Sequence, residues 1–230
     1  MENEKRDSYG GVSRSAITEQ DFTMAVGFGG NSSATAMGDY SVAAVHGDDV
    51  EASTKGEFSI AAGGGYSNET YASGDFSIAA SAGHEVNHAY TTGNYSCAAV
   101  TSKTDYCSVA TAGADSCAFL ASPSGLGTVR AKNKNSCAVT PTSVAFAESP
   151  DSCAIALSHG AFARADAKDS VAFSFNGNSA YGDLGSYLVL VERDWEDDHI
   201  KGIQVVHIDG ETYPPGRYQL IDGVITEVER

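Results

Sequence analysis

Four stretches of the chain repeat one pattern: GDYSVAA at 38–44, GEFSIAA at 56–62, GDFSIAA at 74–80 and GNYSCAA at 93–99. Weaker copies follow: GADSCAF from Gly113, KNSCAV from Lys134, PDSCAI from Pro150 and KDSVAF from Lys168. The repeated serines lie at positions 41, 59, 77, 96, 116, 136, 152 and 170. A repeat at a nearly fixed period of this length is the sequence signature of a solenoid, in which each coil buries its apolar face against its neighbours.

Each repeat has room for two short strands. A second, weaker copy of the pattern lies midway between many of the serines, as at Val50-Glu51-Ala52 and Asn178-Ser179-Ala180. Gly, Asp, Asn and Ser separate these segments, and they are the residues that turns favour. No stretch shows a helical period. We therefore predict an all-β chain whose residues 21–182 form a parallel β-solenoid, a β-roll of about 18 residues per coil.

Strand alternation sorts the repeated side chains onto two faces. One face carries two apolar columns of varied size, which begin with Val42 and Ala44. The other carries the repeated serines and the alanines that follow each of them, such as Ala43 and Ala61. One face fills the roll and the other lies outside. The alternation does not decide which is which.

The two ends of the chain depart from the repeat. Residues 1–20 are expected to form an N-terminal cap or arm. Residues 183–230 read as a small antiparallel β unit with strands at 187–191 and 203–208 and hairpin turns at Asp209-Gly210 and Asp222-Gly223. A solenoid needs capped ends because its open coils expose unpaired strand edges.

The charge balance limits the classes of partner. The chain has 14 Lys and Arg against 30 Asp and Glu, a formal net charge of −16. This argues against direct nucleic-acid binding through a basic face and against attachment to an anionic membrane, but it suits a basic protein partner. The opening residues, MENEKRDSYGG, lack the apolar core of a signal peptide. We therefore expect a cytoplasmic location or a place in an assembly such as a virion.

One stretch, His84-Glu85-Val86-Asn87-His88, matches the H-E-x-x-H pattern of zinc proteases. That pattern requires a helix, which places both histidines on one face, one turn apart. Here it falls in the weak half-repeat between Ser77 and Ser96, where a strand is expected. Two histidines four residues apart in a strand lie about 13 Å from each other, too far for one zinc ion. We therefore expect no enzyme, no metal site and no cofactor.

Two further columns suggest alternatives. Cys97, Cys117, Cys137 and Cys153 share a position that Val or Ile fills in other repeats, so they are interpreted as small buried hydrophobes rather than as a soft-metal ladder. Asp39, Glu57 and Asp75 recur at one turn of each coil. They could form an acidic ladder that binds calcium or mimics a phosphate backbone, or they could be ordinary solvated turn residues.

An aromatic column distinguishes the early repeats from the late ones. Tyr40, Phe58, Phe76 and Tyr95 precede the serine in the first four units, whereas Asp or Asn stands there in later units. Aromatic side chains anchor interfaces because they bury much area with few rotamers. We take this column and the neighbouring carboxylates as the candidate partner surface, which comprises Asp39, Tyr40, Glu57, Phe58, Asp75, Phe76 and Tyr95.

The GDYSVAA and NSCA units resemble the head repeats of trimeric autotransporter adhesins, whose heads are left-handed parallel β-rolls that associate as trimers, although the coil is longer here. The whole chain is similar to uncharacterised phage and prophage proteins with GDxSxA repeats and a terminal unit like GSYLVLVERDW…VVHIDGETYPPGRYQLIDGVITEVE. These resemblances imply a non-enzymatic structural or attachment protein that works as a homotrimer. The alternative is an intracellular phage-encoded inhibitor of a host defence or DNA-handling system, acting as an acidic DNA mimic or a ligand sponge.

Overall fold

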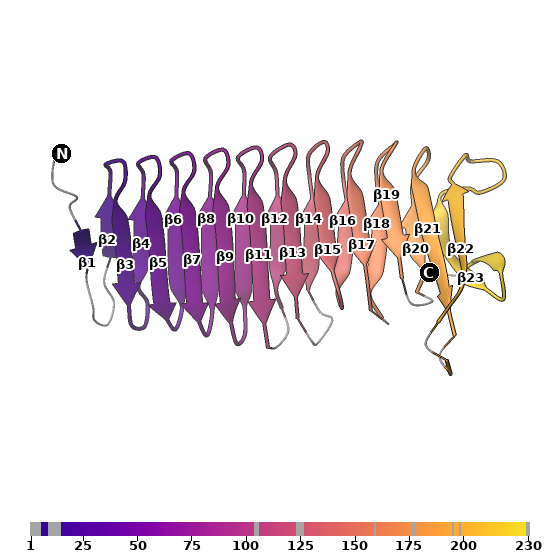
Figure 1. Ribbon diagram of the computed structural model, residues 1–230, viewed down its shortest axis with the longest axis horizontal. Helices are drawn as coiled ribbons and strands as arrows, with labels where there is room; N and C mark the ends of the chain where they lie inside the picture. The colour runs from indigo at the N-terminus through magenta and orange to yellow at the C-terminus, as the bar shows by residue number, and fades with distance from the viewer. Residues whose placement is uncertain are drawn as a thin grey trace.

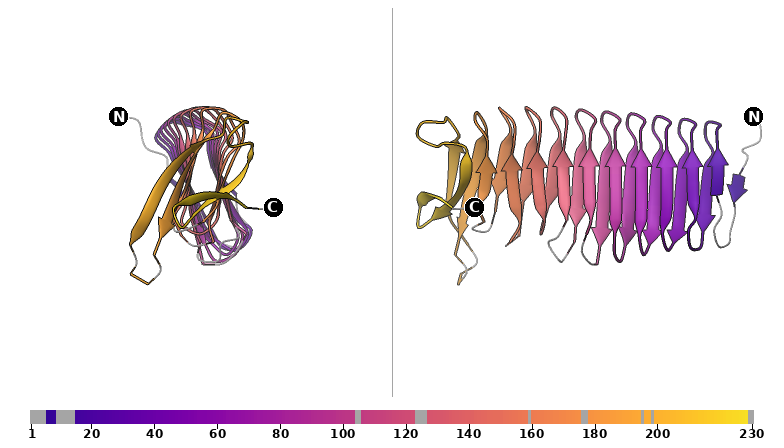
Figure 2. Two further views of the ribbon diagram at one scale, coloured as in Figure 1. Left: turned by 90° about the vertical axis from the view of Figure 1, so that its right-hand side faces the viewer. Right: turned by 180° about the vertical axis from the view of Figure 1, so that it is seen from behind.

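The computed structural model describes residues 6–8, 15–103, 106–122, 127–158, 160–175, 178–194, 196–197 and 199–228. They form two 12-stranded sheets that face each other along an elongated rod (Figures 1 and 2). Up to residue 193 the chain alternates between the sheets, so each coil contributes one strand to each. The predicted all-β solenoid is therefore confirmed. The described residues form no helix long and apolar enough to cross a membrane.

The two sheets are named here A and B. Sheet A contains β1 (Arg6–Ser8), β3 (Met24–Phe28), β5 (Val42–Gly47), β7 (Ile60–Gly65), β9 (Ile78–Gly83), β11 (Cys97–Ser102), β13 (Cys117–Ala121), β15 (Cys137–Thr140), β17 (Cys153–Ala156), β19 (Val171–Ser174), β21 (Tyr187–Arg193) and β22 (Ile200–His207). Sheet B contains β2 (Ser15–Thr18), β4 (Ser33–Ala36), β6 (Val50–Thr54), β8 (Asn68–Ala72), β10 (Asn87–Thr91), β12 (Ser108–Thr111), β14 (Thr128–Ala131), β16 (Val144–Ala147), β18 (Phe162–Ala165), β20 (Ala180–Gly182), β23 (Gly216–Ile221) and β24 (Val224–Glu227).

Neighbouring coils pair in parallel and in register. Val42 lies opposite Ile60 and Ile60 lies opposite Ile78, so equivalent repeat positions form straight columns along the rod. The same pairing joins β2 to β4. Parallel coil pairing therefore already includes residues 15–18, before the expected solenoid start at residue 21.

The Ser/Ala face fills the roll. The alanines that follow the repeated serines are fully buried, and the serines themselves are at most 3% exposed. The larger Val, Ile and Cys side chains of the same strands point outward, and Ile60 and Ile78 are 39% and 41% exposed. These small side chains fill most of the roll without spare volume, and the larger side chains of Val109, Leu120 and Val129 are also fully buried in its middle coils.

The buried serines satisfy the polar backbone of the turns. The Ser59 hydroxyl donates to the Gly38 carbonyl of the preceding coil at 3.3 Å and accepts the amide of Ser41 at 3.2 Å. The Ser77 hydroxyl does the same one coil further on, with Gly56 and the Ser59 amide. Because an unpaired buried polar group is costly, these bonds explain why serine recurs inside an otherwise apolar roll.

The glycines of the GDYS turns allow the turns to stack closely. A Cβ atom on Gly56 would lie 2.0 Å from the Gly38 carbonyl oxygen, and one on Gly74 would lie 2.0 Å from that of Gly56. Any other residue would force the turns apart at these positions.

The C-terminal strands close one end of the rod (Figure 1). β21 still pairs in parallel with β19, whereas β22 pairs antiparallel with β21, and β23 and β24 extend sheet B in antiparallel fashion. The interior is larger here, with Leu188, Leu190 and Ile208 fully buried. This confirms an antiparallel C-terminal β unit on a solenoid.

The two predicted hairpin turns have different outcomes. Asp222 and Gly223 have φ values of 49° and 75° and join β23 to β24 as a tight hairpin. Asp209-Gly210 does not form a hairpin, because it lies where the chain leaves sheet A for sheet B. The Asp209 carboxylate instead accepts the amides of Glu211, Thr212 and Tyr213 at 2.8 to 3.0 Å. These three bonds hold the pKa of Asp209 below its usual range, the Tyr213 bond contributing most.

Candidate partner surface

The aromatic column of the early repeats forms a stacked ladder along one line of turns. This aromatic ladder comprises Phe22, Tyr40, Phe58, Phe76 and Tyr95. Successive ring centroids are 4.9 to 5.1 Å apart and the ring planes differ by at most 9°. The spacing is close to the ~4.8 Å between neighbouring strands, so each ring stacks on the ring of the next coil. The side chains remain 44 to 66% exposed, which makes the ladder a surface ridge.

The backbone at the ladder is left-handed. Tyr40, Phe58 and Phe76 each have a φ of 55°, a conformation that costs a residue with a Cβ about 1–2 kcal/mol. The equivalent positions of the late repeats hold Asp or Asn, which tolerate this conformation. We infer that ring-on-ring stacking offsets the backbone cost in the early coils.

The three predicted acidic residues lie beside the ladder, in the same turns. The Asp39 carboxylate accepts the Glu57 amide of the next coil at 2.8 Å, and the Asp75 carboxylate accepts the Asn94 amide at 2.7 Å. Asp39 and Asp75 are therefore turn residues that join consecutive coils. Glu57 is exposed, and its carboxylate accepts no hydrogen bond from any described residue.

Sequence reasoning missed the first member of the surface. Phe22 stacks on Tyr40 with a centroid distance of 5.0 Å, and the Asp21 carboxylate accepts the Asp39 amide at 2.8 Å. Gln20 and Thr23 stand where the later units have Gly and Ser, which hid this coil from the repeat pattern. The Asp-aromatic pair at the repeat spacing was the signal that could have revealed it.

Taken together, the structure assembles all seven predicted residues at one corner of the rod. Both faces of Tyr40, Phe58 and Phe76 are occupied by neighbouring rings, so along its length the ladder offers ring edges to a partner. Its length is about 20 Å, four coil spacings of ~4.8 Å. A binding role for this corner stays a prediction.

The H-E-x-x-H stretch forms a turn followed by a strand. His84 lies in the turn after β9 and stacks on Tyr66, with ring centroids 5.5 Å apart. His88 lies in β10, where its Nδ1 is 2.8 Å from the Ser108 hydroxyl. Asn87 is buried in the roll and accepts a hydrogen bond from the Asn68 side-chain amide at 2.7 Å. The expected strand therefore includes His88 but not His84.

The described part of the chain also holds side chains of the types that bind metal ions. A group of three such side chains is Asp194, Asp197 and His199, beside the turn between β21 and β22. Their ligand atoms lie within 4.8 Å of one another. Two of the three are exposed, and exposed acidic groups of this kind are common without an ion.

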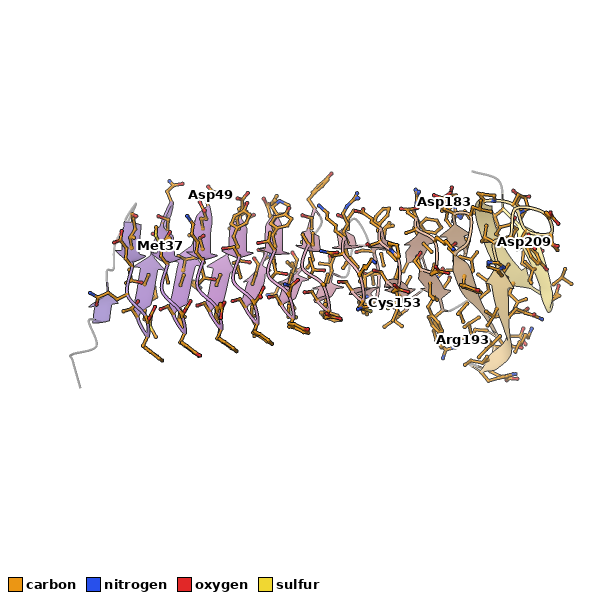
Figure 3. The ribbon with its side chains drawn as sticks, turned by 90° about the horizontal axis from the view of Figure 1, so that it is seen from above. Met37, Asp49, Cys153, Asp183, Arg193 and Asp209 are labelled. Atoms are coloured by element: carbon orange, nitrogen blue, oxygen red, sulfur yellow. The ribbon has the colours of Figure 1, made fainter. Side chains whose placement is uncertain are left out.

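The column of four cysteines faces outward, which corrects their interpretation as buried hydrophobes. Cys97, Cys117, Cys137 and Cys153 are half-buried on the outer face of sheet A and pair in register from coil to coil (Figure 3, which labels Cys153). They face outward because the alternate residues of the same strands, including the buried alanines, occupy the interior. Cys107, which lies outside this column, is buried.

Neighbouring thiols in this column influence each other. The Cys117 thiol hydrogen-bonds to Cys97 and lowers the pKa of Cys97 to about 7, while the same bond raises the pKa of Cys117. The Sγ atoms of Cys137 and Cys153 are 2.8 Å apart. Their interaction lowers the pKa of Cys153 and raises that of Cys137. The Cys97 thiol therefore ionises near neutral pH.

Comparisons with protein-family models, with curated proteins and with solved structures find no match for this chain.

Proposed function

We propose that this chain is a non-enzymatic structural or attachment protein of the phage type, which assembles as a homotrimer and offers the aromatic corner of its solenoid to a partner. The observation that supports assembly is the outer face of sheet A. The proposal of a trimer rather than another oligomer rests on the resemblance of the repeats to trimeric adhesin heads.

The outer face of sheet A is apolar over ten consecutive strands. Its first column is Met24, Val42, Ile60, Ile78, Cys97, Cys117, Cys137, Cys153, Val171 and Tyr187. Its second column is Val26, Ala44, Ala62, Ala80, Ala99, Phe119, Val139, Ile155, Phe173 and Val189. Neither column holds a charged residue, although the chain has 14 Lys and Arg and 30 Asp and Glu.

The outer face of sheet B is polar and charged, in contrast to that of sheet A. In the strands that accompany these coils it presents polar and charged side chains such as Glu51, Glu69, His88 and Arg130. A continuous apolar face that is present on one side of a protein and absent from the other marks a contact surface. Because every chain carries the same flat, uncharged face, further copies of the chain are the partners that match it over its whole length.

The size of the face suits a stable interface. Ten strands at ~4.8 Å spacing extend about 43 Å, and two side-chain columns cover a width of about 15 Å, so each chain offers on the order of 600 Å². A standard interface buries about 800 Å² per partner. The apolar face alone thus approaches the area that stable association requires.

Light scattering on a size-exclusion column tests the assembly. At about 10 µM we expect a species of three 23.8 kDa chains, about 71 kDa. Ile60→Glu with Ile78→Glu places charges on the apolar face and should yield a 23.8 kDa monomer. The matched control, Thr35→Glu with Ser53→Glu, alters the outer face of sheet B and should remain a trimer. A monomeric wild type, or a trimer that persists in the Ile60/Ile78 variant, would refute the proposal.

The location of the protein distinguishes the attachment role from the alternative, an inhibitor of a host system. An attachment protein is found in purified virions, whereas an inhibitor of a host system is found free in the cytoplasm of the infected cell. An antibody against the chain, applied to purified particles and to infected-cell lysate, distinguishes the two. Detection only in the lysate would favour the inhibitor.

A further inference from the structure

A groove on the outer face of sheet B, in the last coils, has a chemistry unlike the rest of this acidic protein. Its volume is about 470 Å³, within the usual range of ligand pockets. The lining residues are Phe162, Arg164, Tyr181 and Arg217. They come from β18, β20 and β23, which are consecutive strands of sheet B. This site is independent of the proposed trimer face on sheet A.

The groove ends a ladder in which arginines alternate with aromatic rings. The register aligns Arg130, Phe146, Arg164, Tyr181 and Arg217 in one column. The Arg130 guanidinium lies 4.5 Å from the centroid of the Phe146 ring, and that of Arg164 lies 4.5 Å from the Tyr181 centroid. The Arg217 guanidinium lies 4.8 Å from the centroid of Phe162. Stacking on rings holds the arginines flat against the sheet.

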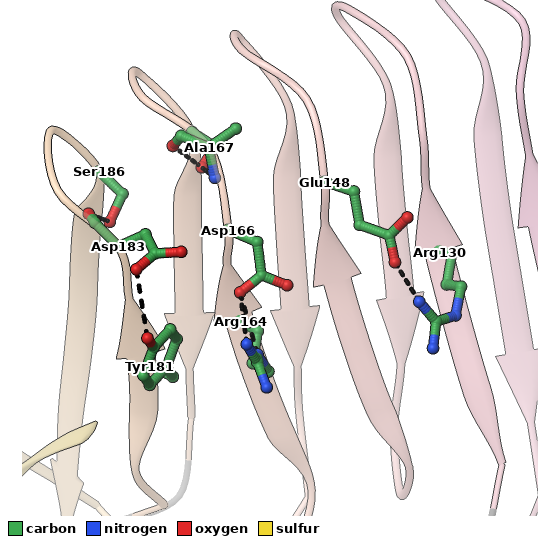
Figure 4. Close-up of polar contacts among 9 residues, drawn as sticks. Arg130, Glu148, Arg164, Asp166, Ala167, Tyr181, Asp183 and Ser186 are labelled. Atoms are coloured by element: carbon green, nitrogen blue, oxygen red, sulfur yellow. Dashed lines mark hydrogen bonds and ion pairs between the residues drawn. The ribbon is translucent and has the colours of Figure 1, made fainter. Parts of the chain in front are cut away.

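Two of these arginines are neutralised and one is not. Arg130 pairs with Glu148, and Arg164 donates from Nε and Nη2 to the Asp166 carboxylate at 3.0 and 2.7 Å (Figure 4). Arg217 donates from Nε to the Ser179 hydroxyl and pairs with no carboxylate among the described residues. Its terminal guanidinium donors therefore remain available, although the side chain is half-buried.

We propose that this groove binds a small planar anion, a ring that carries a phosphate or a carboxylate. The guanidinium of Arg217 supplies a planar fork of donors that matches either oxyanion. Phe162 and Tyr181 supply aromatic surface beside it for the ring. A half-buried cation held in place in advance loses little side-chain entropy when it binds an anion.

Two charges limit the size of the ligand: the single positive charge of the groove and the negative net charge of the chain. One uncompensated arginine suits one anionic group. A long polyanion would extend over a molecule of net charge −16 and would be repelled beyond the groove. A nucleoside monophosphate has the required ring and anionic group and serves as the probe.

Isothermal titration calorimetry with AMP tests the site. Inorganic phosphate and adenosine, which are the two halves of the probe, should each bind at least ten-fold more weakly than AMP. Benzoate, a ring with a carboxylate, tests the other oxyanion. If benzoate binds and AMP does not, the ligand is a carboxylate. The proposal is overturned if none of the probes binds at millimolar concentration.

Substitutions assign the binding to Arg217. Arg217→Gln should weaken AMP binding at least ten-fold, and Arg217→Lys should weaken it less because the charge remains. The matched control is Arg130→Gln, since Arg130 also stacks on a ring but is ion-paired and lies outside the groove. It should bind AMP within two-fold of wild type. Equal effects at both positions would refute the site.

Circular dichroism and thermal unfolding check that the Arg217 variants fold. If Arg217→Gln does not fold, Phe162→Leu removes the stacking ring and leaves the Arg217 charge in place. That variant should weaken AMP at least three-fold while binding of inorganic phosphate stays unchanged. An unchanged affinity of Phe162→Leu for AMP would contradict a ring-stacking site.

Discussion

The turns of the early and late coils share one backbone shape but are stabilised differently. In the early coils each turn amide donates to the next turn, as from Tyr40 to the Glu57 carbonyl at 2.9 Å and from Phe58 to the Asp75 carbonyl at 3.0 Å. This series continues to Asp115 and is interrupted at Asn135 and Asp151, whose amides donate to no backbone carbonyl of the next turn among the described residues. It resumes at Asp169, whose amide donates to the Gly185 carbonyl at 2.9 Å.

Three sequence features change at the same place. The tight-turn glycines, ending with Gly113, give way to Asn133, Ser149 and Ala167. The stacked aromatic rings end at Tyr95. The bonds in which the residue after the turn glycine accepts an amide of the next coil end with Asn94, whose side-chain oxygen accepts the Ala114 amide at 2.9 Å. One turn later the Asn135 side-chain amide donates to the Asp115 carboxylate at 3.0 Å instead. Close turn stacking thus requires glycine at the first turn position and lets the aromatic rings of successive coils stack. Looser turns admit a Cβ atom at the first position and carry Asp or Asn, which tolerate a positive φ, in place of the ring.

The largest effect is expected at a glycine of the early turns. Gly56→Ala places a Cβ atom 2.0 Å from the Gly38 carbonyl oxygen, and we expect it to cost about 3 kcal/mol of unfolding free energy, measured by urea denaturation. Gly30→Ala is the control, because its nearest neighbour would be 3.9 Å away. The late counterpart, Ala167→Gly, should cost about 1 kcal/mol or less. Equal losses at Gly56 and Gly30 would remove the distinction between close and loose turns.

A smaller effect is expected where an early ring is exchanged for the late residue type. Phe76→Asn should lower the unfolding free energy by about 1–2 kcal/mol, since two ring contacts are lost and Asn still accepts the left-handed backbone. Phe76→Val should cost more, because a β-branched residue is strained at a φ of 55°. A loss above about 4 kcal/mol for Phe76→Asn would mean that the ring belongs to the core and the candidate surface is structural only.

The smallest effect changes reactivity and leaves stability unaffected. In chains kept monomeric by dilution, where the sheet A face is open to reagent, the pKa of Cys97 is lowered to about 7, and its alkylation by iodoacetamide should accelerate between pH 6 and 8, since the thiolate is the reactive form. The pKa of Cys117 is raised, so Cys117 should stay slow over that range. Peptide mass spectrometry after timed labelling measures both sites. Cys117→Ala removes the thiol donor and should slow Cys97 at pH 7 by returning its pKa toward the ordinary value. Equal rates at Cys97 and Cys117 in the wild-type sequence would contradict this assignment.

The repeat made the fold class and the seven residues of the candidate surface predictable, because in-register coils place equivalent residues in one column. The errors come from long-range strand pairing, which local residue patterns do not show. Asp209-Gly210 resembles a hairpin turn but lies at a crossing between sheets, which depends on where β22 and β23 find partners. The arginine groove was missed because its residues lie far apart in the sequence, and only the strand order β18, β20, β23 brings them together.

The sequence by itself determined the coil length, the strand alternation and the turn chemistry, since these follow from local residue spacing. Only the tertiary structure decided which strand face is inside. A period of two residues defines two strand faces but does not determine which of them is buried. The choice comes from the narrow gap between the sheets, which accepts the Ser and Ala columns with their hydrogen bonds and leaves Val, Ile and Cys outside. That choice exposes the apolar face that the proposed trimer would bury.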